Sequence, residues 1–227
     1  MDRLDTLAPI REKVEAHERL DFEDGLALME SDDLLALGEL ADLARRVRGG
    51  DDEVYFIQNF YLNQTNVCRV KCKFCAFAMT RREADAYTLT ADELVEDALA
   101  QHERARFTEI HIVNGENPHV GFDFYVETVR KLHEALPEVH LKLYTASEIH
   151  HMTTISGLSH EEVLRELQAA GLGSLPGGGA EIFAERVRGL IAPGKEHPEF
   201  WFHTHETAHR LGIPTHCTML YGHVETY

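Results

Sequence analysis

The 227-residue sequence has no run of eighteen apolar residues, and its first twenty residues carry charges instead of an apolar signal core. A membrane span needs about twenty apolar residues in a row, so we expect no membrane partner. The sequence is also poor in basic residues, with 22 Lys and Arg against 39 Asp and Glu, which gives a formal net charge of −17. This negative charge repels phosphate backbones and argues against nucleic acid as a partner.

Cysteine is scarce as well, since the chain has only four. Three of them, Cys68, Cys72 and Cys75, fall within eight positions, whereas Cys217 lies near the end. Because no signal peptide is apparent, we expect a cytoplasmic protein whose thiols stay reduced. Clustered thiols in that compartment favour metal binding or catalysis over disulfides.

Two regions differ in pattern. Residues 1–50 have apolar positions at helical spacing, with Asp21 and Ser31 as predicted N-caps and Gly49-Gly50 as a stop. Residues 51–227 alternate between strand and helix patterns. We therefore predict an N-terminal helical segment, 1–50, followed by a second domain, 51–227.

Repeated strand–helix units of this size predict parallel strands joined by right-handed crossovers. A closed eight-fold barrel takes about 250 residues, more than remain here. The fold class predicted is therefore α/β, a partial (β/α) TIM-type barrel with about five strands. The expected strands are 54–62, 108–115, 139–149, 172–179 and 214–222, and the expected helices are 90–105, 122–136, 159–171, near 180–190 and 198–211, with capping residues at Thr90, Glu93, Ser159 and Gly171.

The cysteines have the spacing C-x3-C-x2-C directly after the first expected strand. A 4Fe–4S cubane has four irons, and three local thiolates leave one iron open for another ligand. Phe74 and Phe77 flank the last cysteine and are expected to shield the cluster from water. A zinc knuckle would need a fourth ligand nearby. Cys217 would turn the site into a pure electron carrier, although its position within a strand is more typical of a small buried apolar residue.

Ligands of a parallel barrel gather at the carboxyl ends of the strands, so we examined those ends in order. Lys142 is expected on the lumen face of the third strand, where it needs a substrate carboxylate or a structural acid. Gly177 and Gly178 belong to a glycine turn that either binds an anion or flat ligand or simply turns the chain. His223 and Glu225 follow the last strand and are predicted to face the same cavity.

The cysteine motif, with an aromatic residue before its last cysteine, resembles the signature of the radical S-adenosylmethionine (SAM) enzymes. The resemblance implies that the open iron binds the amino and carboxylate groups of SAM. Gly115-Glu116 resembles the glycine–glutamate motif that receives the SAM ammonium, with Asn114 in place of a first glycine. Glu148, in "YTASEI", is predicted to accept a hydrogen bond from the SAM ribose, with helix capping as the alternative.

Longer stretches, such as "SLPGGGAEIF" and "CTMLYGHVET", resemble the menaquinone-pathway branch of this superfamily. That resemblance implies addition of a 5′-deoxyadenosyl radical to a small-molecule substrate, an aryl enol ether dicarboxylate. A cyclase of the same pathway, or a non-catalytic iron–sulfur or zinc module, are the alternatives. Members of the branch continue beyond the fifth strand, so we expect a C-terminally truncated chain in which Lys142, His223 and Glu225 serve catalysis.

Basic residues interleave the cysteines in this acidic protein, at Arg69, Lys71 and Lys73. One interpretation is a solvated loop. The other is a docking patch for an acidic electron donor, flavodoxin or ferredoxin, steered by opposite charge.

Overall fold

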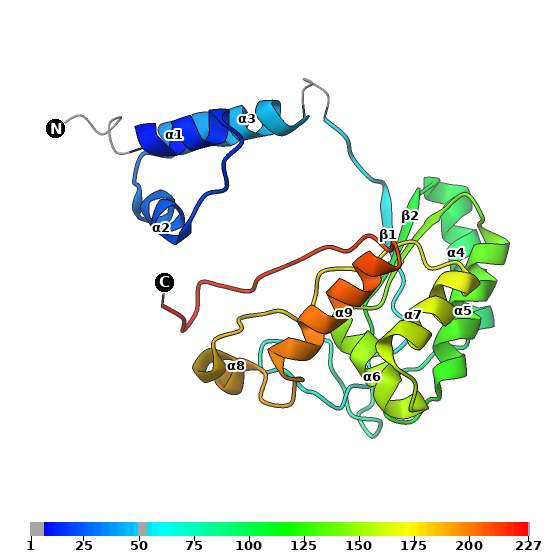
Figure 1. Ribbon diagram of the computed structural model, residues 1–227. Helices are drawn as coiled ribbons and strands as arrows, with labels where there is room; N and C mark the ends of the chain where they lie inside the picture. Colours follow the sequence, from blue (N-terminus) through cyan, green and yellow to red (C-terminus); the bar gives the residue numbers. More distant parts are fainter. Residues whose placement is uncertain (1–6, 50–53, 227) are drawn as a thin grey trace. The chain divides into compact units, whose positions relative to one another are not determined.

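The computed structural model describes residues 7–49 and 54–226, which form two compact units (Figure 1). The first unit runs to Phe56 and the second covers Ile57–Thr226. The predicted boundary between residues 50 and 51 lies outside the described residues, so the domain assignment stays a prediction. Within the described ranges, every helix falls short of the length or apolarity that a membrane crossing needs.

Three helices make up the first unit: α1 (Ala8–Glu15), α2 (Phe22–Glu30) and α3 (Leu34–Gly49). Asp21 caps α2 in a capping box with Asp24, as its position before the helix predicts. The predicted N-cap at Ser31 is wrong, because Ser31 ends α2, and Asp33 accepts the hydrogen bond from the N–H of Ala36 at the start of α3.

A parallel sheet with strand order β1-β2-β3 organises the second unit, and its strands are short. They are β1 (Asn59–Tyr61), β2 (Glu109–Ile112) and β3 (His140–Leu143), in the register Phe60–Ile110–Leu141. The two further expected strands form only single parallel bridges, Lys142 to Ser174 and Leu175 to Thr215. These bridges continue the sheet in barrel order, so the partial barrel is present with three named strands instead of five.

The helices of the second unit cover one face of this sheet, except for the short helix Glu185–Ile191, which contributes no residue to that core. In chain order they are α4 (Ala91–Ala105), α5 (Phe122–Ala135), α6 (Ala146–Ser156), α7 (His160–Ala170), α8 (Glu185–Ile191) and α9 (Pro198–Arg210). Helix α4 packs on α5, α5 on α7, and α7 on α9, which gives the arc of helices visible in Figure 1. Parallel strands with helices between them produce this arrangement because each crossover helix returns the chain to the same end of the sheet.

Side-chain alternation along the strands separates the core from the lumen. Ile110 and Ile112 of β2, with Leu141 and Leu143 of β3, are fully buried against the helices. The intervening positions are polar and lie on the opposite face, since successive strand residues point to opposite sides. The predicted lumen position of Lys142 follows from the same alternation.

Local capping chemistry fixes where the helices begin. The capping boxes Thr90–Glu93 and Ser159–Glu162 open α4 and α7, and Gly171 ends α7 in the left-handed conformation. The expected strand 139–149 is too long, because a third box, Thr145–Glu148, starts α6 directly after β3. The first expected strand, 54–62, also shrinks, to Asn59–Tyr61.

We predict that the α4 core contact is a main source of stability. Leu94 is 0% exposed and Leu99, on the same helix, is 41% exposed. Replacing a buried leucine by alanine leaves a cavity and costs about 2–5 kcal/mol, whereas an exposed site costs less than about 1 kcal/mol. Urea unfolding of Leu94→Ala and of the matched Leu99→Ala variant measures the difference. Equal losses in the two variants would contradict this packing.

Candidate cofactor and active site

One cavity collects most of the predicted site residues. It has a volume of about 200 Å³ and is formed by the cysteine loop, the ends of β2 and β3, and the glycine turn. A larger cavity, about 850 Å³, lies within the first unit, where no thiol lines it. The second unit has other cavities too, but the cavity of about 200 Å³ is the one of those described that cysteines line, and it is therefore the candidate site. Its predicted lining residues are Cys68, Cys72, Phe74, Cys75, Gly115, Glu116, Glu148 and Gly178.

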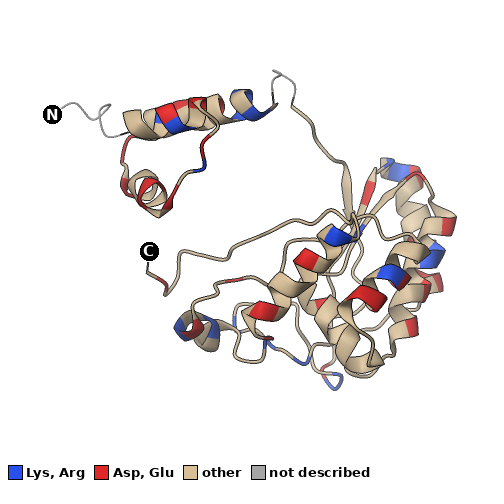
Figure 2. Cartoon of the chain, in the orientation of Figure 1, with Lys and Arg blue, Asp and Glu red and all other residues tan. Residues whose placement is uncertain are grey.

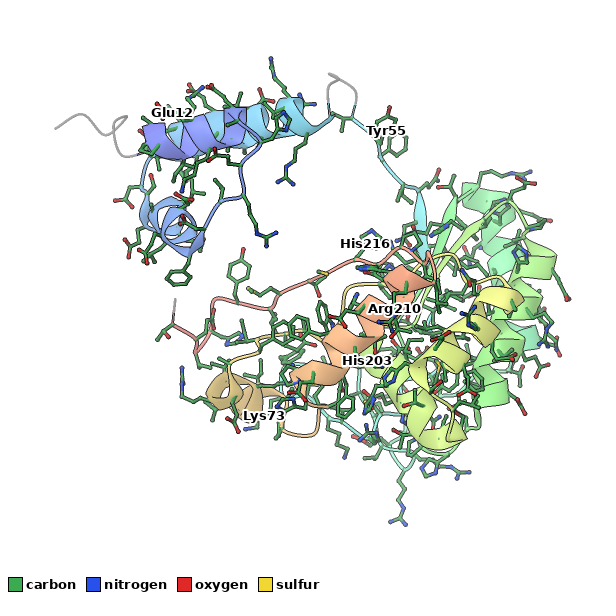
Figure 3. The ribbon with its side chains drawn as sticks, in the orientation of Figure 1. Glu12, Tyr55, Lys73, His203, Arg210 and His216 are labelled. Atoms are coloured by element: carbon green, nitrogen blue, oxygen red, sulfur yellow. The ribbon has the colours of Figure 1, made fainter. Side chains whose placement is uncertain are left out.

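Backbone hydrogen bonds hold the cysteine loop on both sides. The N–H of Cys68 donates to the carbonyl of Met79 at 3.0 Å, and the N–H of Cys75 donates to that of Cys72 at 3.0 Å. From the far side, the N–H of Lys73 donates to the carbonyl of Ile191 at 2.8 Å, and Figure 3 accordingly shows Lys73 beside the end of α8. The loop is thus fixed before any ligand binds.

The donor set of this loop fits an iron–sulfur cubane. Within residues 7–49 and 54–226, no three His, Cys, Asp or Glu side chains come close enough to hold one metal ion. A single zinc ion needs its ligands around one point, whereas a cubane takes each thiolate at a different corner. Three thiols that line one cavity can supply the three local thiolates of such a cluster. Phe74 and Phe77 line the same cavity, as the shielding role requires.

Burial favours the protonated form of the Cys72 thiol. It raises the pKa of Cys72 to about 11, while the positive charge of Lys195 acts in the opposite direction. A thiol must lose its proton to ligate a metal, so cluster assembly releases protons here.

Cys217 lies apart from this arrangement. It is exposed and is absent from the residues that line the cavity. The expectation that Cys217 is a small buried core residue is therefore wrong, because the segment after Thr215 leaves the sheet after a single bridge. Its position outside the cavity also gives no support to the fourth-ligand alternative.

Gly115 brings the end of β2 against the cysteine loop. A Cβ at Gly115 would lie 2.4 Å from the carbonyl oxygen of Val67, closer than any side chain tolerates. The N–H of Gly115 donates to the carbonyl of Thr65, and the N–H of Arg69 donates to the carbonyl of Glu116. Gly115 therefore allows the backbone after β2 to contact the cysteine loop. This contact brings Glu116, the next residue, to the same cavity as Cys68.

Glu116 presents a buried carboxylate to the cavity. Its side chain is 4% exposed, and the guanidinium of Arg69 lies 2.8 Å from Oε2. That contact lacks hydrogen-bond alignment, and Oε2 has no hydrogen-bond partner among the described residues. Burial, followed by the charge of Glu196, raises the pKa of Glu116 to about 7, although Arg69 opposes the shift. A carboxylate oxygen left without a donor suits a ligand that carries an ammonium group.

Glu148 accepts hydrogen bonds from the start of α6 and from the end of β2. Its carboxylate accepts hydrogen bonds from the N–H and hydroxyl of Thr145 and, at 2.8 Å, from the N–H of Asn114. Burial raises its pKa to about 7, although these hydrogen bonds act to lower it. The capping alternative is thus present in the structure. Two oxygens accept about four hydrogen bonds, so one position remains for a ligand.

The three glycines of the turn each meet a different neighbour. A Cβ at Gly177 would lie 2.8 Å from the carbonyl carbon of Cys217, and one at Gly178 would lie 2.9 Å from Thr145. Gly179 has φ +100°, and a Cβ there would lie 2.5 Å from Ser147. Gly178 and Gly179 line the cavity, whereas Gly177 faces the segment at Cys217. Close packing therefore accounts for all three glycines, and two of them leave backbone at the cavity wall.

The remaining predicted residues lie outside this cavity. Lys142 forms a buried ion pair with Glu109, with side-chain exposures of 11% and 4%, so the structural acid of the two predicted partners is present. Burial, and then the charge of Lys142, lower the pKa of the neighbouring His111 to about 4. His223 and Glu225 pair with each other at 3.0 Å near the end of the chain.

Sequence reasoning missed four polar residues that line the cavity: Thr145, Ser147, Glu181 and Lys195. Glu181 lies two residues after the last glycine of the turn, and this closeness to the turn was the signal that could have found it. Lys195 lies in the segment between α8 and α9, where no periodicity or motif marks it.

A profile of the radical SAM superfamily matches residues 62–227. The chain is 47% identical over 220 residues to the aminodeoxyfutalosine synthase of Thermus thermophilus, and 50% identical over 216 residues to that of Streptomyces coelicolor. These alignments cover 97% and 95% of this chain, but only 59% and 55% of the relatives. The chain therefore spans little more than half the length of these curated relatives.

Relatives with other names also match. A 5-amino-6-(D-ribitylamino)uracil–L-tyrosine 4-hydroxyphenyl transferase of Methanopyrus kandleri is 39% identical over 175 residues, covering 77% of this chain and 47% of the relative. Among solved structures, methylornithine synthase has a TM-score of 0.68 at 19% identity, over 90% of this chain and 57% of that one, which shows the fold alone. The chain belongs to the radical SAM superfamily.

We predict that the buried carboxyl of Glu116 makes cluster-free protein less stable as the pH rises. In the folded state the pKa of Glu116 is raised from 4.5 to about 7. Between these two pH values the folded protein therefore holds a proton on Glu116 that the unfolded chain has lost. The free energy of unfolding of the wild type should fall across this range relative to that of Glu116→Gln. Denaturant unfolding at several pH values checks this, and parallel pH profiles of the two proteins would contradict it.

Proposed function

We propose that this chain is the cluster-binding part of an aminodeoxyfutalosine synthase, a radical SAM enzyme of menaquinone biosynthesis. One observation carries the proposal: the three thiols line the same cavity as Glu116, a buried carboxylate paired with Arg69. The identity to two relatives of that name supports the choice of reaction. Since the chain spans little more than half of those relatives, the activity is proposed for the whole protein.

The residues of the cavity divide the work of holding the cofactors. Cys68, Cys72 and Cys75 ligate three irons of a 4Fe–4S cluster and leave the fourth iron to SAM. Glu116 receives the ammonium of SAM, because a cation with its own N–H donors satisfies the buried oxygen. When bound, the cluster and SAM supply a 5′-deoxyadenosyl radical.

The walls of the cavity orient SAM and exclude water. Glu148 has one acceptor position left for a ribose hydroxyl, and its bond to the N–H of Asn114 keeps that oxygen beside Glu116. Phe74 covers the cluster, and the backbone at Gly178 and Gly179 offers a flat surface next to it. A radical survives only where water and stray hydrogen donors are kept out, so this apolar and backbone lining serves the reaction.

The proposed substrate is an aryl enol ether with two carboxylates. The cavity, at about 200 Å³, is below the roughly 300–1,000 Å³ typical of pockets that enclose a small ligand. The remaining length of the relatives is proposed to supply the rest of the substrate wall. Lys142 is held by its ion pair with Glu109, and the ring of His223 by hydrogen bonds to the backbone of Leu220 and Val224, so a substrate role for either side chain requires that these contacts open.

Anaerobic reconstitution with iron and sulfide tests the cluster. We expect about four irons per chain and a paramagnetic resonance spectrum that SAM perturbs. Cys68→Ser, Cys72→Ser and Cys75→Ser should each lose most of the iron, whereas Cys217→Ser, the matched control, should keep it. Zinc in the purified protein, or loss of iron in Cys217→Ser, would overturn the proposal.

The reaction itself is tested on a protein of the relatives' full length, with SAM, reductant and the enol ether. The mass of aminodeoxyfutalosine among the products supports the proposed synthase. SAM cleavage with a product of another mass would assign the chain to a related radical SAM reaction, such as the pathway's cyclase. Absence of SAM cleavage by a cluster-loaded enzyme would leave a non-catalytic iron–sulfur module.

The electron donor is proposed to dock on the cysteine loop. Arg69, Lys71 and Lys73 are exposed there, whereas acidic side chains are spread over the helices of both units (Figure 2). An acidic flavodoxin or ferredoxin would be steered to this basic loop. We expect the rate of cluster reduction by flavodoxin to fall as ionic strength rises, and to fall further in Lys71→Gln. Stopped-flow reduction with dithionite is the control, and a flavodoxin rate that salt leaves unchanged would refute the docking site.

A further inference from the structure

A buried lysine shares the cavity with the three cysteines. Lys195 is 11% exposed, and its Nζ donates a hydrogen bond to Oε1 of Glu181 at 3.1 Å. Both residues line the cavity of Cys68, Cys72 and Cys75. The proposed function assigns neither of them a role.

The position of Lys195 is fixed by the backbone around it. The segment that carries it touches the cysteine loop, because a Cβ at Gly194 would lie 2.8 Å from the carbonyl oxygen of Val70. The carbonyl of Ile191, at the end of α8, accepts the hydrogen bond from the N–H of Lys73. The lysine is therefore attached to the same loop as the thiols, and moves with it.

Glu181 is held just as firmly. Its φ of +49° is in the left-handed region, which is costly for a residue with a side chain, and its carbonyl accepts a hydrogen bond from the N–H of Leu220 at 3.1 Å. Such strain persists where the surroundings impose it. The backbone thus aims the carboxylate at Lys195.

The ammonium of Lys195 lies at the wall of the cavity beside the cysteine loop, with Glu181 as its ion-pair partner. The other nearby carboxylates have partners of their own. Glu196 is engaged by the hydroxyl of Ser147 at 2.6 Å, Glu116 by Arg69 at 2.8 Å, and Glu148 by the N–H groups of Asn114 and Thr145. Burial acts to lower the pKa of Lys195, but the neighbouring carboxylates, Glu181 foremost, outweigh it and the pKa is raised, so the lysine is charged.

We propose that Lys195 is a positioning charge that favours the reduced form of the iron–sulfur cluster, and that Glu181 limits this effect. The inference rests on the cluster assigned under the proposed function. Reduction takes one electron from the external donor, which is oxidised, and adds one negative charge to the cluster without forming or breaking a bond. A fixed cation at short range in a partly buried site stabilises that added charge.

Redox poising of the reconstituted 227-residue chain tests this. The ratio of reduced to oxidised cluster is read by paramagnetic resonance at one fixed solution potential in the wild type and in Lys195→Met, Lys195→Arg and Glu181→Gln. We expect about a tenfold lower ratio in Lys195→Met, which is about 59 mV for a one-electron couple. The ratio should rise in Glu181→Gln and stay near that of the wild type in Lys195→Arg.

Lys131→Met is the matched control. Lys131 is also ion-paired, with Asp92 and Glu127, but it lies on helix α5 and does not line the cavity of the cysteines. Equal ratios in Lys195→Met and Lys131→Met would overturn the inference. So would a shift in the same direction in Lys195→Met and Glu181→Gln, which indicates a structural role. If Lys195→Met fails to hold iron, Glu181→Gln alone tests the inference. A ratio of reduced to oxidised cluster above that of the wild type supports it, and an unchanged or lower ratio overturns it. Failure of the wild type to assemble a cluster would instead refute the proposed function.

Discussion

The contact between the end of β2 and the cysteine loop is the constraint on which the rest of the site depends. The backbones at Gly115 and Val67 approach too closely for any side chain at position 115. Two backbone hydrogen bonds, from Gly115 to Thr65 and from Arg69 to Glu116, hold the loop across this contact, and a third, from Cys68 to Met79, joins the two ends of the loop. The sheet thereby sets the distance between the thiols and the buried carboxylate. A loop of this length would otherwise sample many conformations, and fixing them would cost free energy each time a ligand bound.

How far the sequence predicts the structure depends on how local each interaction is. The N-caps at Thr90 and Ser159 are encoded within four consecutive residues, and both are present as predicted. The start of α6 is encoded in the same way, by Thr145 and Glu148, but the apolar alternation before it extended the predicted strand too far. The last two strands depend on pairing with distant segments, and here they form only single bridges.

The residues of the candidate site show the same difference between local and long-range signals. Cys68, Cys72 and Cys75 were found because their spacing alone indicates a cluster ligand set. Glu116 was found through the resemblance to a known motif. Lys195 was not found, because its meaning comes from the fold: a chain contact at Gly194 brings it to the thiols, and no pattern around it reports that contact. For Lys142 the sequence predicted an anionic partner, because a lysine in the lumen needs one. It left open whether that partner is a substrate carboxylate or an acidic side chain, and the structure has Glu109 there.

The left-handed backbone at Glu181 has a consequence for anyone who engineers this protein. A residue with a side chain costs about 1–2 kcal/mol in that conformation, whereas glycine adopts it freely. Glycine at position 181 would relieve this cost, but it would leave the buried Lys195 without its ion-pair partner, and the loss of one partner of a buried pair costs about 3–5 kcal/mol. A library built on this scaffold should therefore keep the carboxylate at position 181, which lines the cavity of the three cysteines.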